Sequence, residues 1–119
     1  MENQVKELLD TFSSHGALEL KEKGRRSILL PSFGLVTKAG IEIVDLCFCF
    51  EHEGFGYVPM LFFSRKINTY RTMNWQSSFY IHKRNWEYFS YRIHTPSVSL
   101  QEKLFIFIRE VQFGKTKNQ

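Results

Sequence analysis

The sequence lacks several features that would assign it to a class at once. No apolar run approaches the ~18–20 residues that a membrane-spanning helix needs. The acidic, amphipathic N-terminus lacks the basic-then-apolar layout of a signal peptide. There is no internal repeat and no low-complexity tract. These absences predict one soluble, intracellular, cytoplasmic domain that does not contact a membrane.

Cysteine is also scarce, with only Cys47 and Cys49 in the chain. They stand two apart in a segment that is typical of a strand, so their Cα atoms should lie ~6.5–7 Å apart. That separation is at or beyond the limit for a disulfide, and a zinc site needs more ligands at turn spacing. The histidines are far apart and lack ligand spacing: His15, His52, His82 and His94. We therefore expect two buried, reduced thiols, no metal site and no cofactor.

Catalytic motifs are missing as well. The only Gly-x-Gly, at 54–56, lies in a predicted turn and is not followed by the Lys-Ser/Thr or the helix of a phosphate loop. No nucleophile elbow and no His-Glu-x-x-His occur. The sequence therefore leans away from an enzyme.

What the chain does have is material for a core, since 43% of its residues are hydrophobic and 16% are aromatic. Hydrophobic periodicity predicts a helix or a strand in most segments. The helices are expected at 3–14 and 99–113, and the strands at 17–22, 27–31, 41–50, 58–63 and 86–94. Ser99 and Glu102 match the capping box that starts a helix.

The segment 41–50 gives the strongest strand pattern. Both of its faces are largely apolar, with Asp45 as the exception, so we expect a central strand covered on both sides. The segment 27–31 is expected to end near Pro31 and Gly34. The segment 68–85 has no clean period and is predicted to be long and irregular, where Trp75, Phe79 and Ile81 could anchor an ordered loop or a short strand.

The order of these elements predicts the fold class. Strands come in one run between two helices, which favours an α+β domain. We expect an antiparallel meander of about four strands, with the N- and C-terminal helices packed on one face. Residues 1–114 should form this single domain, and 115–119 should be a disordered basic tail.

Charge is distributed unevenly and suggests one class of partner. Residues 1–53 carry a net charge of −3, and residues 54–119 carry +7. The segment 80–94 mixes aromatic and basic side chains, which single-strand nucleic-acid binding uses. A small nucleic-acid-binding protein is therefore an alternative function, and a strand with buried aromatics and solvated charges would explain the pattern equally well. The residues of this alternative are Lys83, Arg84, Tyr88 and Arg92.

A family resemblance points to another function. The element order is similar to that of ubiquitin-conjugating enzymes, and so are the passage Gly56–Ile67 and the stretch Thr95–Val111 that follows Trp86. The chain resembles more closely the bacterial ubiquitin-conjugating-like proteins, which carry Trp-x-x-aromatic-Ser-Arg-His. Its counterparts are Trp86, Phe89, Ser90, Arg92 and His94. The resemblance implies a UBC/RWD-like fold.

The sequence departs from that family in ways that affect function. Tyr91 and Ile93 separate the Ser, Arg and His, and only Asn68 is left to match the Asn of the His-Pro-Asn motif. No cysteine follows Cys49, so the thioester-forming thiol of the family is missing. The resemblance therefore implies a non-catalytic protein-interaction module with a protein partner, such as a ubiquitin-like protein.

The interposed residues have one physical consequence. On a strand, Ser90, Arg92 and His94 share one face, and together they could bind a carboxylate or a phosphate. With Trp86 they form the predicted binding site. An ordinary solvated strand face is the plainer interpretation, and an enzyme that uses His94 with Arg92 and Ser90 is a third.

Overall fold

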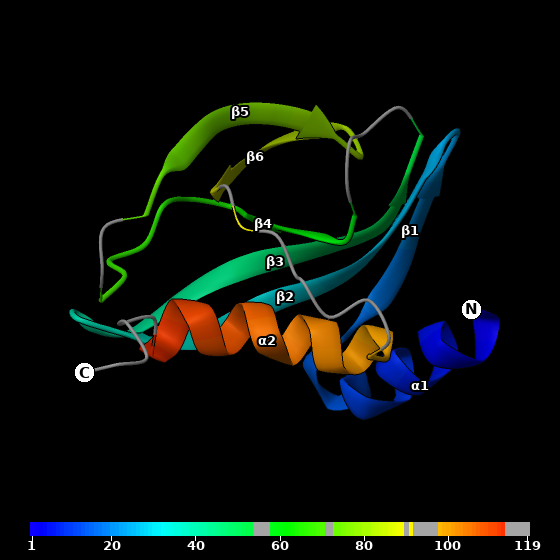
Figure 1. Ribbon diagram of the computed structural model, residues 1–119, viewed down its shortest axis with the longest axis horizontal. Helices are drawn as coiled ribbons and strands as arrows, with labels where there is room; N and C mark the ends of the chain where they lie inside the picture. Colours follow the sequence, from blue (N-terminus) through cyan, green and yellow to red (C-terminus); the bar gives the residue numbers. More distant parts are fainter. Residues whose placement is uncertain (54–57, 71–72, 90, 92–97, 114–119) are drawn as a thin grey trace.

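In the described part of the computed structural model, six strands lie between an N-terminal and a C-terminal α-helix (Figure 1). The structure describes residues 1–53, 58–70, 73–89, 91 and 98–113. Its elements are α1 (Glu2–Thr11), a 3-10 turn (Ser13–His15), β1 (Leu18–Glu22), β2 (Arg25–Thr37), β3 (Gly40–His52), β4 (Met60–Phe63), β5 (Trp75–Ile81), β6 (Arg84–Phe89) and α2 (Leu100–Phe113). The predicted tail at 115–119 lies outside the described residues.

The strands form one antiparallel sheet in the order β1-β2-β3-β4-β6-β5. The α+β class is right, but the expected meander of about four strands is wrong, because the sheet of the described residues has six strands. The missed strand is β5, inside the segment predicted to be irregular. A register shift between Gln76 and Phe79 interrupts its alternation, which removes the sequence signal.

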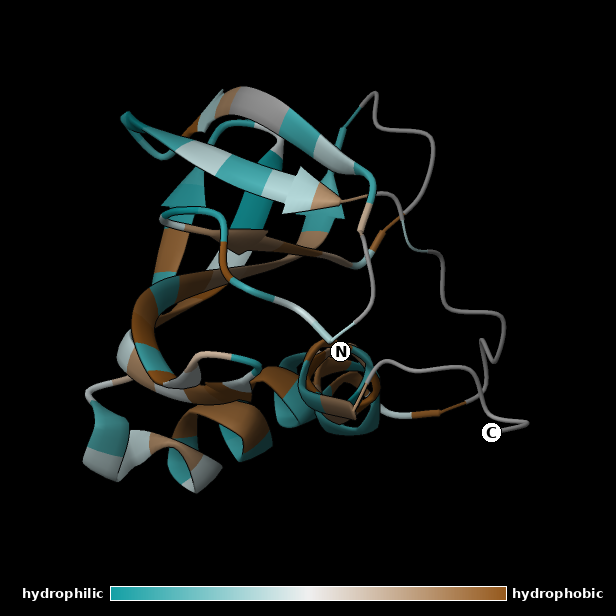
Figure 2. Cartoon of the chain, turned by 90° about the vertical axis from the view of Figure 1, so that its left-hand side faces the viewer, coloured by the Kyte–Doolittle hydropathy of each residue, from teal (hydrophilic) through white to brown (hydrophobic). Residues whose placement is uncertain are grey.

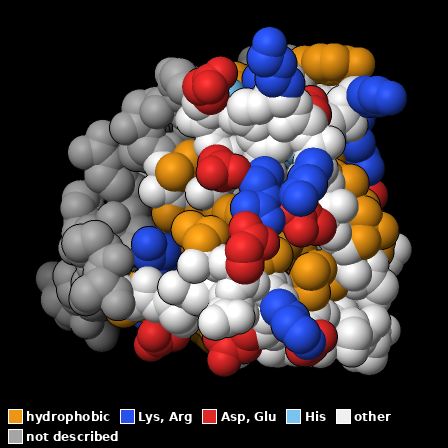
Figure 3. Space-filling model, turned by 90° about the vertical axis from the view of Figure 1, so that its right-hand side faces the viewer, with side chains coloured by type: hydrophobic (Ala, Val, Ile, Leu, Met, Phe, Trp, Pro, Cys, Tyr) orange, Lys and Arg blue, Asp and Glu red, His pale blue; other side chains and the backbone are white. Residues whose placement is uncertain are grey.

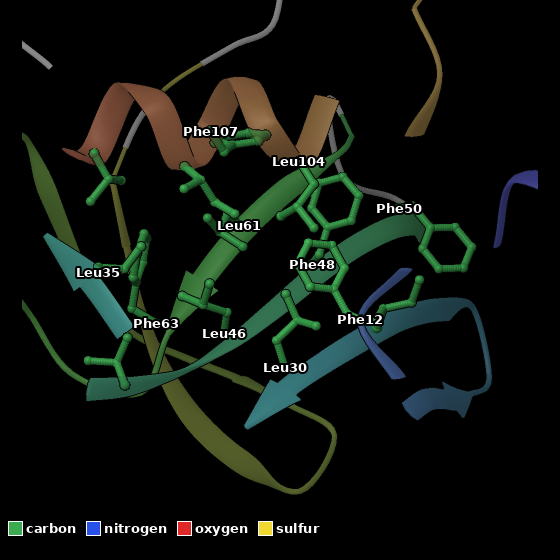
Figure 4. Close-up of a cluster of buried hydrophobic side chains, with 14 of the residues drawn as sticks. Phe12, Leu30, Leu35, Leu46, Phe48, Phe50, Leu61, Phe63, Leu104 and Phe107 are labelled. Atoms are coloured by element: carbon green, nitrogen blue, oxygen red, sulfur yellow. The ribbon is translucent and has the colours of Figure 1, made fainter. Parts of the chain in front are cut away.

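Both helices lie on one face of the sheet (Figure 1) and form the main core with it, whose buried side chains Figure 4 shows. Each helix turns an apolar stripe inward, and the inward positions of β2, β3 and β4 meet it. Residues at the centre of this core include Leu8, Leu30, Leu46, Phe48, Leu61, Leu104 and Phe107. The predicted capping box is confirmed: the Glu102 amide donates to the Ser99 hydroxyl, and the Ser99 amide donates to the Glu102 carboxylate.

The other face of the sheet is covered by the chain's own β5–β6 hairpin, which arches over β3 and β4 (Figures 1 and 2). Side chains from both layers make a second, smaller core there, consisting of Cys47, Cys49, Met60, Phe62, Ile81 and Trp86. β3 is therefore buried on both faces over residues 46–50, as its apolar pattern predicts.

The double burial of β3 does not extend to its first half. β1 pairs with β2 only as far as Leu29, and β4 pairs with β3 only from Leu46 onward. The distal part of the β2–β3 hairpin therefore projects beyond its neighbours. On the β3 face that further along carries Cys47 and Cys49, Ile41 is 71% exposed and Ile43 is 54% exposed. The expectation that β3 is covered on both sides is therefore wrong for this half of the strand.

β2 is longer than predicted because the strand continues past Pro31, which was expected to end it. The expected break at Pro31 and Gly34 is instead a bulge, where the register with β3 shifts between Leu30 and Phe33. Ser32 takes a left-handed φ of 50°, and its amide donates to the Asp45 carboxylate over 2.8 Å. Asp45, the polar exception in the β3 pattern, thus holds the bulge in place.

A nearly buried carboxylate joins β3 to the segment after β4. Glu42 accepts hydrogen bonds from Thr37 Oγ1 (2.7 Å), Arg65 Nη1 (2.8 Å), and the backbone and side-chain nitrogens of Asn68 (3.0 and 2.9 Å). Burial alone would raise the pKa of Glu42, but these donors outweigh it and hold that pKa at about 2. Asn68, which the resemblance matched to the Asn of the His-Pro-Asn motif, thus donates hydrogen bonds from both of its nitrogens to Glu42.

We predict that Glu42→Gln lowers the free energy of unfolding at pH 7 by about 2 kcal/mol, because it removes charge-assisted bonds to a nearly buried group. The lowered pKa means that the wild-type chain loses this contribution as pH falls from 4.5 towards 2. Denaturant titrations across that range should show a shallower pH dependence for Glu42→Gln. The exposed Glu7→Gln is the control, and an equal pH dependence in wild type and Glu42→Gln would contradict the assignment.

Candidate functional site

Of the predicted binding residues, the structure places Trp86, and it places it in the second core. Its side chain is 1% exposed, and its Nε1–H donates to the Ile81 carbonyl over 3.2 Å. The Arg84 guanidinium lies over the ring, 4.3 Å from its centroid. Ser90, Arg92 and His94 fall outside the described residues, so the predicted row beside Trp86 stays a prediction.

The residues of the nucleic-acid alternative are spread over different environments. Lys83 is exposed at the β5–β6 turn, whereas Arg84 is bonded to Asp45 over 3.2 Å. Tyr88 lies edge-on to Phe62 in the second core, with ring centroids 5.4 Å apart. Arg92 is outside the described residues. The described members therefore do not form an open row of stacking aromatics and free cations.

A polar cluster that no sequence motif indicated lies where the β5–β6 turn meets β1 and β2. The Oγ of Ser27 is 2.8 Å from Nε2 of His82, and Nδ1 of His82 is 3.6 Å from the Glu22 carboxylate. The backbone amide of His82 also donates to that carboxylate, over 3.0 Å. The three residues stand at positions 22, 27 and 82, so only the tertiary fold brings them together.

The order hydroxyl, imidazole, carboxylate is that of a hydrolytic triad. Ser27, however, is fully buried, and the His82 side chain is only 4% exposed. A substrate carbonyl cannot reach a hydroxyl covered in this way. The cluster therefore ties the hairpin tip to the sheet and is closed to chemistry in this conformation.

The tip itself is a turn of an unusual composition. His82 and Lys83 both have positive φ, 49° and 66°, where a two-residue hairpin turn normally uses Asn and Gly. Burial lowers the pKa of His82 below its usual value of 6.5, although the Glu22 carboxylate acts in the opposite direction. The imidazole is thus held in its neutral form against the sheet.

Both thiols lie beneath the hairpin beside this cluster. The structure confirms that Cys47 and Cys49 are free and buried. Burial raises the pKa of Cys47 to about 12 and also raises the pKa of Cys49, despite hydrogen bonding with Ser27. A nucleophilic cysteine needs an exposed thiolate, so neither thiol is set up for catalysis.

A hollow of about 660 Å³ lies between the β1–β2 turn and the end of β3. Its two arginines form ion pairs with carboxylates in or beside the hollow. Arg26 bonds Glu19 over 2.8 Å and Glu2 over 2.7 Å, and Arg25 lies 3.3 Å from Glu22. Figure 3 shows basic and acidic side chains intermingled on the face that includes β1. Such a surface does not select a ligand of one charge.

The distal face of the β2–β3 hairpin exposes several apolar side chains next to one another. Val36 is 41% exposed and pairs with Ile41, and Ile43 pairs with Gly34. A methyl group on Gly34 would lie 3.3 Å from Ile41 and 3.4 Å from Ile43, so this glycine lets the two side chains lie over the neighbouring strand. We call Gly34, Val36, Ile41 and Ile43 the hairpin face.

Comparison with known proteins adds no family to this geometry: no protein-family model, curated protein or solved structure matches the chain. The resemblance to ubiquitin-conjugating-like proteins therefore stays a prediction. Neither described helix is long and apolar enough to cross a membrane. Among the described residues, no group of three or more His, Cys, Asp or Glu is arranged to hold a metal ion.

We predict that Trp86→Ala lowers the free energy of unfolding by about 3–5 kcal/mol, because it leaves a large cavity in the second core. Tyr80→Ala, on the same hairpin but 63% exposed, should change it by less than about 0.5 kcal/mol. Chemical denaturation of both variants measures the difference. A small effect at Trp86 would show that its ring is a surface group.

Proposed function

We propose that the chain is a non-catalytic protein-interaction module that binds its partner through the hairpin face. The observation that carries this proposal is the exposure of three aliphatic side chains on neighbouring strands: Val36 at 41%, Ile41 at 71% and Ile43 at 54%. Contiguous exposed apolar side chains on a rigid sheet are typical of the centre of a protein interface.

The burial of the candidate nucleophiles supports the non-catalytic part of the proposal. Ser27, Cys47 and Cys49 are each fully buried, and the chain has no cysteine after Cys49. The one serine–histidine pair that the described residues contain is closed beneath the hairpin tip. With both thiols and the histidine-paired hydroxyl buried, and no metal cluster among the described residues, the chain is better suited to binding than to group transfer.

The surroundings of the hairpin face indicate the chemistry of the partner. Lys38 stands in the turn at its end, and Arg65, which donates to the Ile43 carbonyl over 3.3 Å, is followed by the exposed Lys66. Among the described residues, no carboxylate forms an ion pair with Lys38 or Lys66. We infer a partner surface with an apolar centre and an acidic rim, because complementary charge favours association. Two copies of this chain would instead bring like charges together.

The resemblance to ubiquitin-conjugating-like proteins adds a ubiquitin-like protein as the class of partner to test first. This part of the proposal rests on the short motif matches at Trp86 and 95–111 and on the order of elements. It does not depend on the hairpin face, so the two parts can fail separately.

Site-specific photocrosslinking tests the hairpin face. The photoreactive residue p-benzoylphenylalanine is placed at position 41, and in a control at position 18, where Leu18 is 45% exposed on β1. We expect a discrete adduct with an acidic partner from position 41 and none from position 18. Ile43→Asp should reduce that adduct at least tenfold, and Lys38→Glu with Lys66→Glu should reduce it and remove its salt dependence.

Other results would contradict the proposal. An adduct between two copies of the chain would overturn the inferred partner chemistry, and equal adducts from both positions would overturn the assignment of the surface. Circular dichroism of each variant shows that the fold persists, which the exposure of the substituted side chains leads us to expect.

The non-catalytic part is tested by mixing the purified chain with an activating enzyme, a ubiquitin-like protein and ATP. We expect no thiol-sensitive adduct, because both thiols are buried and weakly acidic. Cys47→Ser and Cys49→Ser are the controls for any adduct that forms. A thioester on either residue would show that the chain is catalytic.

A further inference from the structure

The two cores of this protein lie on opposite faces of the sheet. The main core joins α1, α2 and the inner face of β2, β3 and β4, and Phe89 and Trp75 at the base of the β5–β6 hairpin pack at its edge. The second core lies between the outer face of β3 and β4 and the β5–β6 hairpin that arches over them in Figure 1. It contains Cys47 and Cys49. Lifting the distal part of the hairpin, with its base still anchored, would therefore open the second core and leave the helices on the sheet.

The hairpin is anchored at its base and held again at its tip. At the base, Trp75 and Phe89 pack on Phe63 of the main core, with ring centroids 5.3 and 5.5 Å apart. The ladder between β4 and β6 consists of one described residue pair, Phe63 with Glu87. Few backbone bonds therefore hold the distal half of the hairpin to the neighbouring strand.

At the tip, it is His82 that connects the hairpin to the neighbouring strands. Its ring reaches Ser27 on β2, and its backbone amide and ring both face Glu22 at the end of β1. These contacts are made from a turn in which two residues with side chains adopt positive φ, a conformation that costs energy unless the surroundings favour it. Neither Asn nor Gly, the usual residues of such a turn, could supply the imidazole.

We propose that the β5–β6 hairpin is a lid over the outer face of the sheet, that His82 is its latch, and that opening the lid exposes Cys47 and Cys49 while the main core stays folded. The lid gates access to the only two thiols of the chain. It also covers Ser27, so opening separates this hydroxyl from the imidazole that it meets in the closed state.

Acid should favour the open lid. The groups that face His82 are Glu22, which favours its protonation, and Arg25 and His52, which oppose it together with burial. In the open state the ring is solvated and binds a proton near pH 6.5, whereas in the closed state it binds one only at lower pH. Opening therefore becomes easier as pH falls below 6.5.

Thiol labelling of the whole chain tests this proposal. The rate of reaction with a maleimide is measured at increasing denaturant and divided by the rate of the unfolded chain at the same pH. We expect measurable labelling at low denaturant, with a normalised rate that rises only weakly as the denaturant concentration increases. Such a weak dependence is the signature of a sub-global opening. Lowering the pH from 7 to 5.5 should raise the normalised rate.

The latch is tested by His82→Gln, with His15→Gln on the helix-covered side as the matched control. We expect His82→Gln to raise the normalised rate about tenfold, since it removes the imidazole contacts, and to abolish its rise in acid. His15→Gln should change neither. Labelling that occurs only with global unfolding in the wild type, or equal rates in the two variants, would overturn the proposal.

Discussion

The structure depends on β3, a strand that has to be buried on both of its faces. Its alternating Phe and Cys side chains, from Leu46 to Phe50, point into two different cores. Two helices cover one face, and the chain's own β5–β6 hairpin covers the other. The extra strands β5 and β6, the curvature of the sheet and the closed polar cluster all follow from this requirement.

The same requirement determines which groups are left to act on other molecules. Covering β3 places the thiols, Ser27 and His82 inside the protein, where they hold layers together. β1, β4 and the β5–β6 hairpin do not extend as far as the distal half of the β2–β3 hairpin. One face of that distal half therefore stays exposed. Ile41 and Ile43 belong to the same apolar strand pattern as the core, yet they face solvent. An apolar strand end that its own chain does not cover is the natural place for a partner.

Much of this fold could be predicted from local patterns. The apolar stripes of α1 and α2, the capping box at Ser99 and the two apolar faces of β3 are each visible within a few residues, because each reflects one element meeting the core. Asp45 also carried a signal, since a single carboxylate among apolar strand residues needs partners, and it has them in Ser32 and Arg84.

The rest could not be predicted, and for identifiable reasons. Bulges at Ser32 and between Gln76 and Phe79 shift the alternation by one position, so β2 looked shorter than it is and β5 was missed. The Ser27–His82–Glu22 cluster joins residues up to 60 positions apart and has no local spacing to recognise. The hairpin face was invisible for a different reason: exposure of Ile41 depends on where β1 and β4 stop pairing, which is a property of the whole sheet.

Residue-by-residue amide hydrogen exchange tests most directly whether the chain consists of a β3-centred core and a separable layer over it. The account predicts that the amides of residues 46–50 exchange most slowly and only through global unfolding, and that those of β5 and β6 exchange with a distinctly smaller opening free energy. If the β5–β6 amides share the free energy and the denaturant dependence of those in β3, the two layers unfold as one unit and the account is wrong.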